Sequence, residues 1–262
     1  MSECSSSSPW IGERPHDSSP PAQARVQLSG RFVLFGPAHL AVLAAVAAAA
    51  AGLPWLLRRR PALRGPARAC LALVLVGLTG LYLVSVSRLG PLSIWDVMPL
   101  HLCDFLILVA LFALATLNET ACELLYFWGG TGTLLATITP DLVFGWPDWR
   151  FLVYFGLHGA VVVTASCVAF ALDRPPRPGA ARRVFRLTNA YAAVVAVVDV
   201  VWGMNFLYLR GKPSVPTLLD RLGPWPLYLV VVEALALGLF LLLEAPLRLL
   251  PAARLRPRRS AD

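Results

Sequence analysis

A histidine, a cysteine and an aspartate interrupt an otherwise apolar stretch of this chain, as His101, Cys103 and Asp104. Hydrocarbon tolerates such side chains only where they face protein or water, and inside a membrane they commonly mark a functional site. His101 and Asp104 are three residues apart, so on a helix they share a face, where the carboxylate can orient the imidazole as a general base. Cys103 lies about 160° around the helix from His101, so a cysteine nucleophile would take its base from His158 instead.

Further polar groups are expected at a similar depth on other helices. Each helical residue rises about 1.5 Å, which places these groups about 6–15 Å below one membrane surface. We therefore predict a polar cavity in the outer half of the membrane. The candidate catalytic residues are His101, Asp104, His158 and Cys103, and the candidate substrate-binding residues are Asp199, Asn205, Asp141 and Tyr208.

Each of these features also has a purely structural interpretation. Intramembrane histidines often form hydrogen bonds between helices, and Cys103 could be a small packing residue. The glycine-rich run 129–133 lacks the lysine and the preceding strand of a phosphate-binding loop, so close helix packing is expected there. Two histidines without a tight spacing motif do not predict a metal site, and no cofactor is expected.

Composition places the chain among polytopic membrane proteins. Of its 262 residues 57% are hydrophobic and 15% charged, whereas soluble domains have about 25% charged residues. The net charge of +8 does not indicate a nucleic-acid partner, because the arginines cluster in short connectors between apolar runs. The predominance of arginine over a single lysine, Lys212, indicates a GC-rich bacterial genome. The five cysteines fall singly, so neither a disulfide framework nor a zinc site is predicted.

The apolar runs predict an all-α bundle of seven transmembrane helices. They cover residues 33–57, 67–88, 96–117, 119–139, 149–171, 184–209 and 225–249. We divide the chain into a disordered tail (1–30), a seven-helix transmembrane domain (31–250) and a basic cytoplasmic tail (251–262). The arginine distribution predicts an outside N-terminus and a cytoplasmic C-terminus, in a multi-pass protein of the cell membrane.

Five motifs in order along residues 32–245 resemble the YwaF family of bacterial integral membrane proteins. They are Pro99–Asp104, Thr139–Leu142, Phe155–Gly159, Asn205–Pro213 and Leu218–Pro226. That family is similar to a eukaryotic transmembrane protein implicated in acyl transfer onto ether phospholipids. The resemblance implies a seven-helix fold and lipid acyl chemistry that uses a cysteine and a histidine. His101 and His158 match the pattern, but Leu100 stands where the eukaryotic motif has its cysteine.

Three classes of function stay open at this stage. In the first, the protein hydrolyses or transfers an acyl group of a phospholipid or another acylated substrate, with a histidine as base and Cys103 or water as nucleophile. In the second, the same groups line the pathway of a transporter or binding protein for a small solute or proton. In the third, they pin helices in a non-catalytic scaffold. Membrane lipids are the expected partners, and the oligomeric state is left open.

Overall fold

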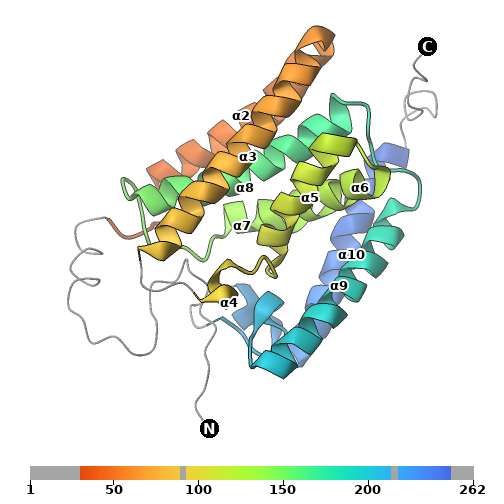
Figure 1. Ribbon diagram of the computed structural model, residues 1–262. Coiled ribbons are helices and arrows are strands. Elements are labelled where there is room, and N and C mark those ends of the chain that lie inside the picture. The colour runs from red at the N-terminus through yellow and green to blue at the C-terminus, as the bar shows by residue number, and fades with distance from the viewer. Residues whose placement is uncertain (1–29, 89–92, 214–217, 249–262) are drawn as a thin grey trace.

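The computed structural model describes residues 30–88, 93–213 and 218–248, and within them the chain is helical (Figure 1). The predicted tails, 1–30 and 251–262, lie almost wholly outside the described residues. The α-helices are α2 (Pro37–Arg59), α3 (Arg64–Ser87), α4 (Ile94–Val97), α5 (Leu102–Thr116), α6 (Glu119–Trp128), α7 (Leu134–Ile138), α8 (Trp149–Phe170), α9 (Ala180–Trp202) and α10 (Leu227–Arg248). A π-helix (Gly129–Thr133) and 3-10 turns at Pro61–Leu63, Phe206–Tyr208 and Leu218–Leu222 connect them.

Five helices in the described part are long and apolar enough to cross a membrane. They span Pro37–Arg59, Pro61–Ser87, Trp149–Phe170, Ala180–Trp202 and Leu227–Leu247. The two remaining predicted spans are different in kind, because α5 has only 15 residues and the segment 119–138 is interrupted by the π-helix. The structure thus gives an all-helical, multi-pass membrane architecture.

Helix α8 is the centre of the bundle. In its most apolar window 72% of the residues are buried, against 11% in α2 and 17% in α9. Helices α2 and α3 pack on one side of α8, while α9 and α10 form a pair on the far side of α5 and α6 (Figure 1). A side chain at Gly159 would come within 2.7 Å of Val46, so glycine permits the close approach of α8 to α2.

Two predicted spans are not continuous helices, which corrects the boundaries expected from the sequence. The span predicted at 96–117 breaks after α4 and resumes at Leu102, because Pro99 lacks an amide hydrogen and restricts the residue before it. The span predicted at 184–209 ends at Trp202, followed by Gly203 with φ +72° and by Leu207 and Tyr208, which also have positive φ. The depths estimated for His101 and Asn205 along continuous helices are therefore wrong.

The glycine run 129–133 forms a π-helix between α6 and α7, in close contact with its neighbours. A Cβ at Gly129 would lie 3.1 Å from the Cβ of Ala165, and one at Gly130 would lie 3.1 Å from Leu243. These distances support the packing interpretation of the run. Single-turn π-helices also occur often near functional sites, since they redirect the side chains that follow.

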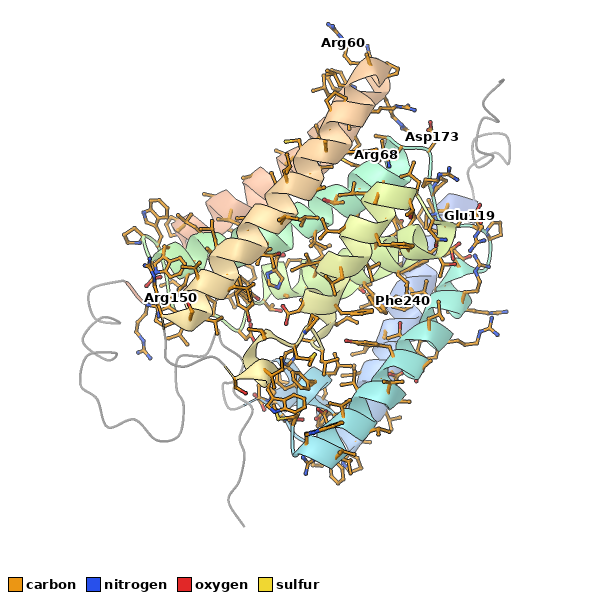
Figure 2. All side chains as sticks on the ribbon, viewed as in Figure 1. Arg60, Arg68, Glu119, Arg150, Asp173 and Phe240 are labelled. Carbon is orange, nitrogen blue, oxygen red and sulfur yellow. The ribbon has the colours of Figure 1, made fainter. Side chains whose placement is uncertain are left out.

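One end of the bundle, here called the basic end, carries a network of charged side chains. The buried Glu123 accepts hydrogen bonds from Arg177 (2.8 Å) and Arg183 (2.7 Å), and Arg177 also pairs with Glu119. The hydrogen bond with Glu123 raises the pKa of the Arg177 guanidinium. Figure 2 shows Glu119 and Asp173 at this end, and Arg60 at the tip of the projecting α2–α3 hairpin.

Candidate functional site

The two helix breaks lie together at the opposite end, here called the polar end. The ring of His101, which precedes α5, lies 5.2 Å from the ring of Phe206 and 5.8 Å from that of Tyr208, both on the turn after α9. Tyr191 of α9 donates a hydrogen bond to the Leu100 carbonyl (2.9 Å). Because neither break continues a helix, the two irregular segments place His101 and Tyr208 side by side.

Asp141, predicted from the sequence as a substrate-binding residue, lies among the other candidates. Its carboxylate accepts hydrogen bonds from Tyr154 (3.4 Å) and Tyr208 (3.5 Å). It also interacts electrostatically with His101, Cys103, Asp104 and His158. The candidates from α5, α8, the 139–148 connector and the turn after α9 therefore form one cluster.

The three described histidines differ in how their ring nitrogens are bonded. In His39, Nδ1 accepts from the Phe35 amide (3.0 Å) and Nε2 donates to the Thr137 carbonyl (3.0 Å), so both nitrogens are engaged. In His158, Nδ1 donates to the Tyr154 carbonyl (2.8 Å), which leaves Nε2 as the basic nitrogen. His101 has ring contacts but no side-chain hydrogen bond to the described residues. His101 thus has both ring nitrogens available to a substrate, whereas His158 has only Nε2 available.

Cys103 and Asp104 follow His101 in the first turn of α5. Cys103 lies next to Thr133 of the π-helix and near the carboxylates of Asp104 and Asp141. The Asp104 carboxylate accepts no hydrogen bond from the part of the chain that the structure describes. His101 precedes the helix in an extended conformation, so the helix face predicted to be shared by His101 and Asp104 is absent. Both Cys103 and Asp104 are partly accessible, so the Asp104 carboxylate is available to a substrate.

Asp199 and Asn205 hold the turn after α9 rather than facing His101. Asp199 is fully buried, and its Oδ1 accepts from the Phe206 amide (2.9 Å), while Oδ2 has no partner among the described residues. The Asn205 amide group donates to the Gly211 carbonyl (3.0 Å) and accepts from the Arg210 amide (2.9 Å). The structure therefore links both residues to the candidate site through the backbone that carries Phe206 and Tyr208.

Sequence reasoning missed three residues of this region. Tyr154 stacks on His158 with ring centroids 4.2 Å apart and contacts Asp141, Thr133 contacts Cys103, and His39 ties α2 to the end of α7. Tyr154 could have been found from the sequence, because it lies four residues before His158 and so on the same helix face. The described residues contain no group of three or more histidine, cysteine or acidic side chains that could hold a metal ion.

A family model described as the TMEM164 family matches residues 34–244 of the chain. No curated protein and no solved structure matches the chain. The matched residues include the candidate membrane helices described above, except the last turn of α10, and the whole of the candidate site. The YwaF name and the lipid acyl chemistry implied by the sequence motifs stay predictions.

Proposed function

Because the chain belongs to the TMEM164 family of membrane proteins, we propose that it acts on the lipid around it, as an acyl hydrolase or transferase whose site is at the polar end. The observation that carries the proposal is the state of His101. It is the only described histidine without a side-chain hydrogen bond, and it lies near the carboxylate of Asp141. An imidazole available to a substrate and next to an acid is the arrangement that general base catalysis needs.

In the proposed reaction, His101 takes a proton from water or from the hydroxyl of an acceptor lipid. The oxygen attacks the ester carbonyl of the donor lipid, and the negative charge that develops lies near the N-terminus of α5, whose first amides have no helical carbonyl partner. When the tetrahedral intermediate collapses, the imidazolium returns the proton to the departing alcohol. The products are a lysolipid and either a free acid or an acylated acceptor.

Water or a hydroxyl is preferred over Cys103 as the nucleophile. Cys103 is surrounded by protein and lies near the carboxylates of Asp104 and Asp141. Negative neighbours oppose formation of a thiolate, the form in which cysteine is nucleophilic. In the second route, the thiol of Cys103 attacks the ester and gives its proton to His158, which passes it to the departing lysolipid alcohol as the ester C–O bond breaks. Water or an acceptor hydroxyl then attacks the thioester, which releases the acyl group and restores the thiol.

The remaining candidates are assigned to substrate binding. Asp141 and Tyr208 form a wall beside His101, and their hydroxyl and carboxylate can bond a polar lipid headgroup. Asp199 and Asn205 act on that wall by holding the turn that carries Tyr208.

The test uses purified full-length protein in liposomes of phosphatidylcholine and phosphatidylethanolamine, with release of fatty acid and acyl exchange measured by mass spectrometry. His101→Ala should lower the rate by at least a hundredfold, the lower range for loss of a general base. Cys103→Ala should leave the water route intact, and Cys70→Ala, on the exposed face of α3, is its matched control. Equal rates in wild type and His101→Ala would reject the proposal, and loss with Cys103→Ala alone would assign the thioester route.

For the topology, we propose that α5 and the segment from α6 to α7 complete seven crossings of the cell membrane, with the N-terminus outside. The arginines concentrated at the basic end support a cytoplasmic location of that end. Single cysteines placed at Arg60 and at Trp146, in a cysteine-free background, test it with a membrane-impermeant maleimide on intact cells. Labelling of the cysteine at position 60 without labelling of the cysteine at position 146 would show that the orientation is the opposite of the one proposed.

A second function, transport of a small solute or proton, is favoured by one specific observation. The non-helical segments 98–101, before α5, and 203–205, after α9, lie together through the contact of His101 with Phe206, and non-helical backbone at helix ends also surrounds transporter sites. A proton flux into protein-containing liposomes, lost in Asp104→Asn and unaccompanied by lipid turnover, would favour this function over acyl chemistry.

A further inference from the structure

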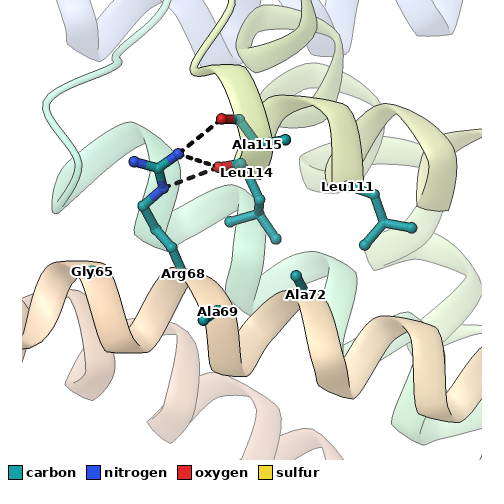
Figure 3. A pocket seen from close by; sticks show the side chains of 7 residues that line it. All are labelled: Gly65, Arg68, Ala69, Ala72, Leu111, Leu114 and Ala115. Atoms are coloured by element: carbon teal, nitrogen blue, oxygen red, sulfur yellow. Dashed lines mark hydrogen bonds between the residues drawn. The ribbon is translucent and has the colours of Figure 1, made fainter.

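A groove lies between α3 and α5 at the basic end, remote from His101 (Figure 3). Its volume is about 310 Å³. Its walls are mainly small or apolar, namely Gly65, Ala69, Ala72, Leu111, Leu114 and Ala115, and Arg68 lines it as the one charged residue. Small residues on α3 face leucines on α5 here, so the two helices leave a space that neither fills. A space of this kind at a membrane-facing surface accepts an acyl chain.

Arg68 lies beside the last carbonyls of α5. Its Nε donates to the Leu114 carbonyl (2.9 Å) and its Nη2 to the carbonyls of Leu114 and Ala115. These bonds fix the guanidinium, while Nη1 makes no hydrogen bond within the described residues. A guanidinium held in this way can bond an anion with its free nitrogen without giving up the contact between α3 and α5.

More positive charge lies on the same α2–α3 hairpin. Arg58 and Arg59, in the last turn of α2, and Arg60, which follows it, are exposed. Arg64, one turn before Arg68 on α3, pairs with Asp173 (2.8 Å). The positive charge of this hairpin therefore exceeds the negative charge that it pairs with.

We propose that this groove binds one anionic glycerophospholipid, with an acyl chain along Ala69, Ala72 and Leu111 and the phosphate at Arg68. The two requirements of such a ligand, an apolar tail and a negative head, match the apolar walls of the groove and the guanidinium of Arg68. Basic pockets between membrane helices bind anionic headgroups in this way. The site is separate from His101 and does not depend on the acyl chemistry proposed above.

The experiment places the full-length protein in nanodiscs of phosphatidylcholine that contain a minor fraction of phosphatidylglycerol, and native mass spectrometry counts the lipids retained on release. We expect phosphatidylglycerol to be enriched over its share in the disc. Arg68→Gln should lower the enrichment about fivefold, the effect of one basic residue near an anionic membrane surface. Ala72→Phe fills the groove without touching an arginine and should lower it as well.

Gly77→Phe is the matched control, since it adds the same ring to α3 at a position with nothing within 4 Å and outside the groove. Equal enrichment in Ala72→Phe and wild type would overturn the proposal, as would an equal loss in Gly77→Phe. Replacing Arg58, Arg59 and Arg60 together by glutamine tests whether these exposed arginines attract anionic lipid without a defined site. If this variant alone loses the enrichment of phosphatidylglycerol, the three arginines and not the groove attract the lipid, and the groove site is rejected.

Discussion

The ionic network at the basic end should respond differently to removal of its acid and of its bases. Glu123 is 2% exposed, whereas the side chains of Arg177 and Arg183 are 42% and 34% exposed. When Glu123→Gln removes the carboxylate, water can solvate the two arginines, so we expect a loss of only about 1–2 kcal/mol. When both arginines become glutamine, the charge of Glu123 stays buried with the backbone amide at position 177 as its remaining donor, and the loss of the cations from a buried pair costs about 3–5 kcal/mol.

The asymmetry predicts an unusual order of stability. Adding Glu123→Gln to the double arginine variant removes the uncompensated charge, so the triple variant should be more stable than the double variant. Thermal unfolding in nanodiscs at a fixed scan rate measures the order. Each kcal/mol corresponds to about 2–4 °C in a chain of this size, so the double variant should melt about 6–20 °C below wild type. Glu119→Gln is the control, because its pair with Arg177 is exposed on both sides and contributes little.

Two results would refute this reasoning. The first is a double arginine variant at least as stable as Glu123→Gln, which would mean that water reaches the carboxylate. The second is a triple variant no more stable than the double variant, which would mean that the arginines act by packing and not by charge.

Three further predictions concern single residues. His39→Ala should lower the free energy of unfolding by about 2–3 kcal/mol, because both ring nitrogens of His39 form hydrogen bonds. His101→Ala should leave the melting temperature nearly unchanged while abolishing activity. Equal destabilisation by the two substitutions would contradict this distinction. Gly159→Ala should lose about 1–3 kcal/mol because the added methyl group would meet α2, and Gly52→Ala, with open space around it, should lose nothing in the same thermal assay. Asp199→Asn should preserve or raise the stability measured by urea-dependent unfolding. The substitution keeps an acceptor for the Phe206 amide and removes a buried charge that has an unbonded oxygen. A large loss of stability would show that the charge itself is required.

The sequence predicted the helical membrane class because that class depends on length and apolar content alone. It also predicted one polar cavity in the outer half of the membrane, whereas the structure brings His101, Asp141 and Tyr208 together and uses Asp199 and Asn205 to hold the turn after α9. The prediction from the sequence failed at positions where the backbone conformation ends a helix. Pro99 was treated as part of a helix although it ends one, and Gly203 was read through although its positive φ terminates α9.

The role of each candidate could not be read from residue type. Three histidines have the same chemistry, yet His39 is fully bonded, His158 half bonded and His101 not bonded, because their neighbours come from distant parts of the chain. The same holds for Asp141, whose partners Tyr154 and Tyr208 lie 13 and 67 residues away. Periodicity places residues on faces of a helix but does not say which faces meet.

The short length of α5 makes the proposed site sensitive to the thickness of the bilayer. Its 15 residues measure about 22 Å, less than the roughly 30 Å of a hydrocarbon core. In the proposed topology, with the basic end at one surface, His101 at the start of α5 would lie several ångströms short of the other surface. Thicker membranes increase this mismatch, and thinner ones reduce it. Water should therefore reach the imidazole more readily in short-chain lipids, so the same protein would work at different rates in membranes that differ only in chain length.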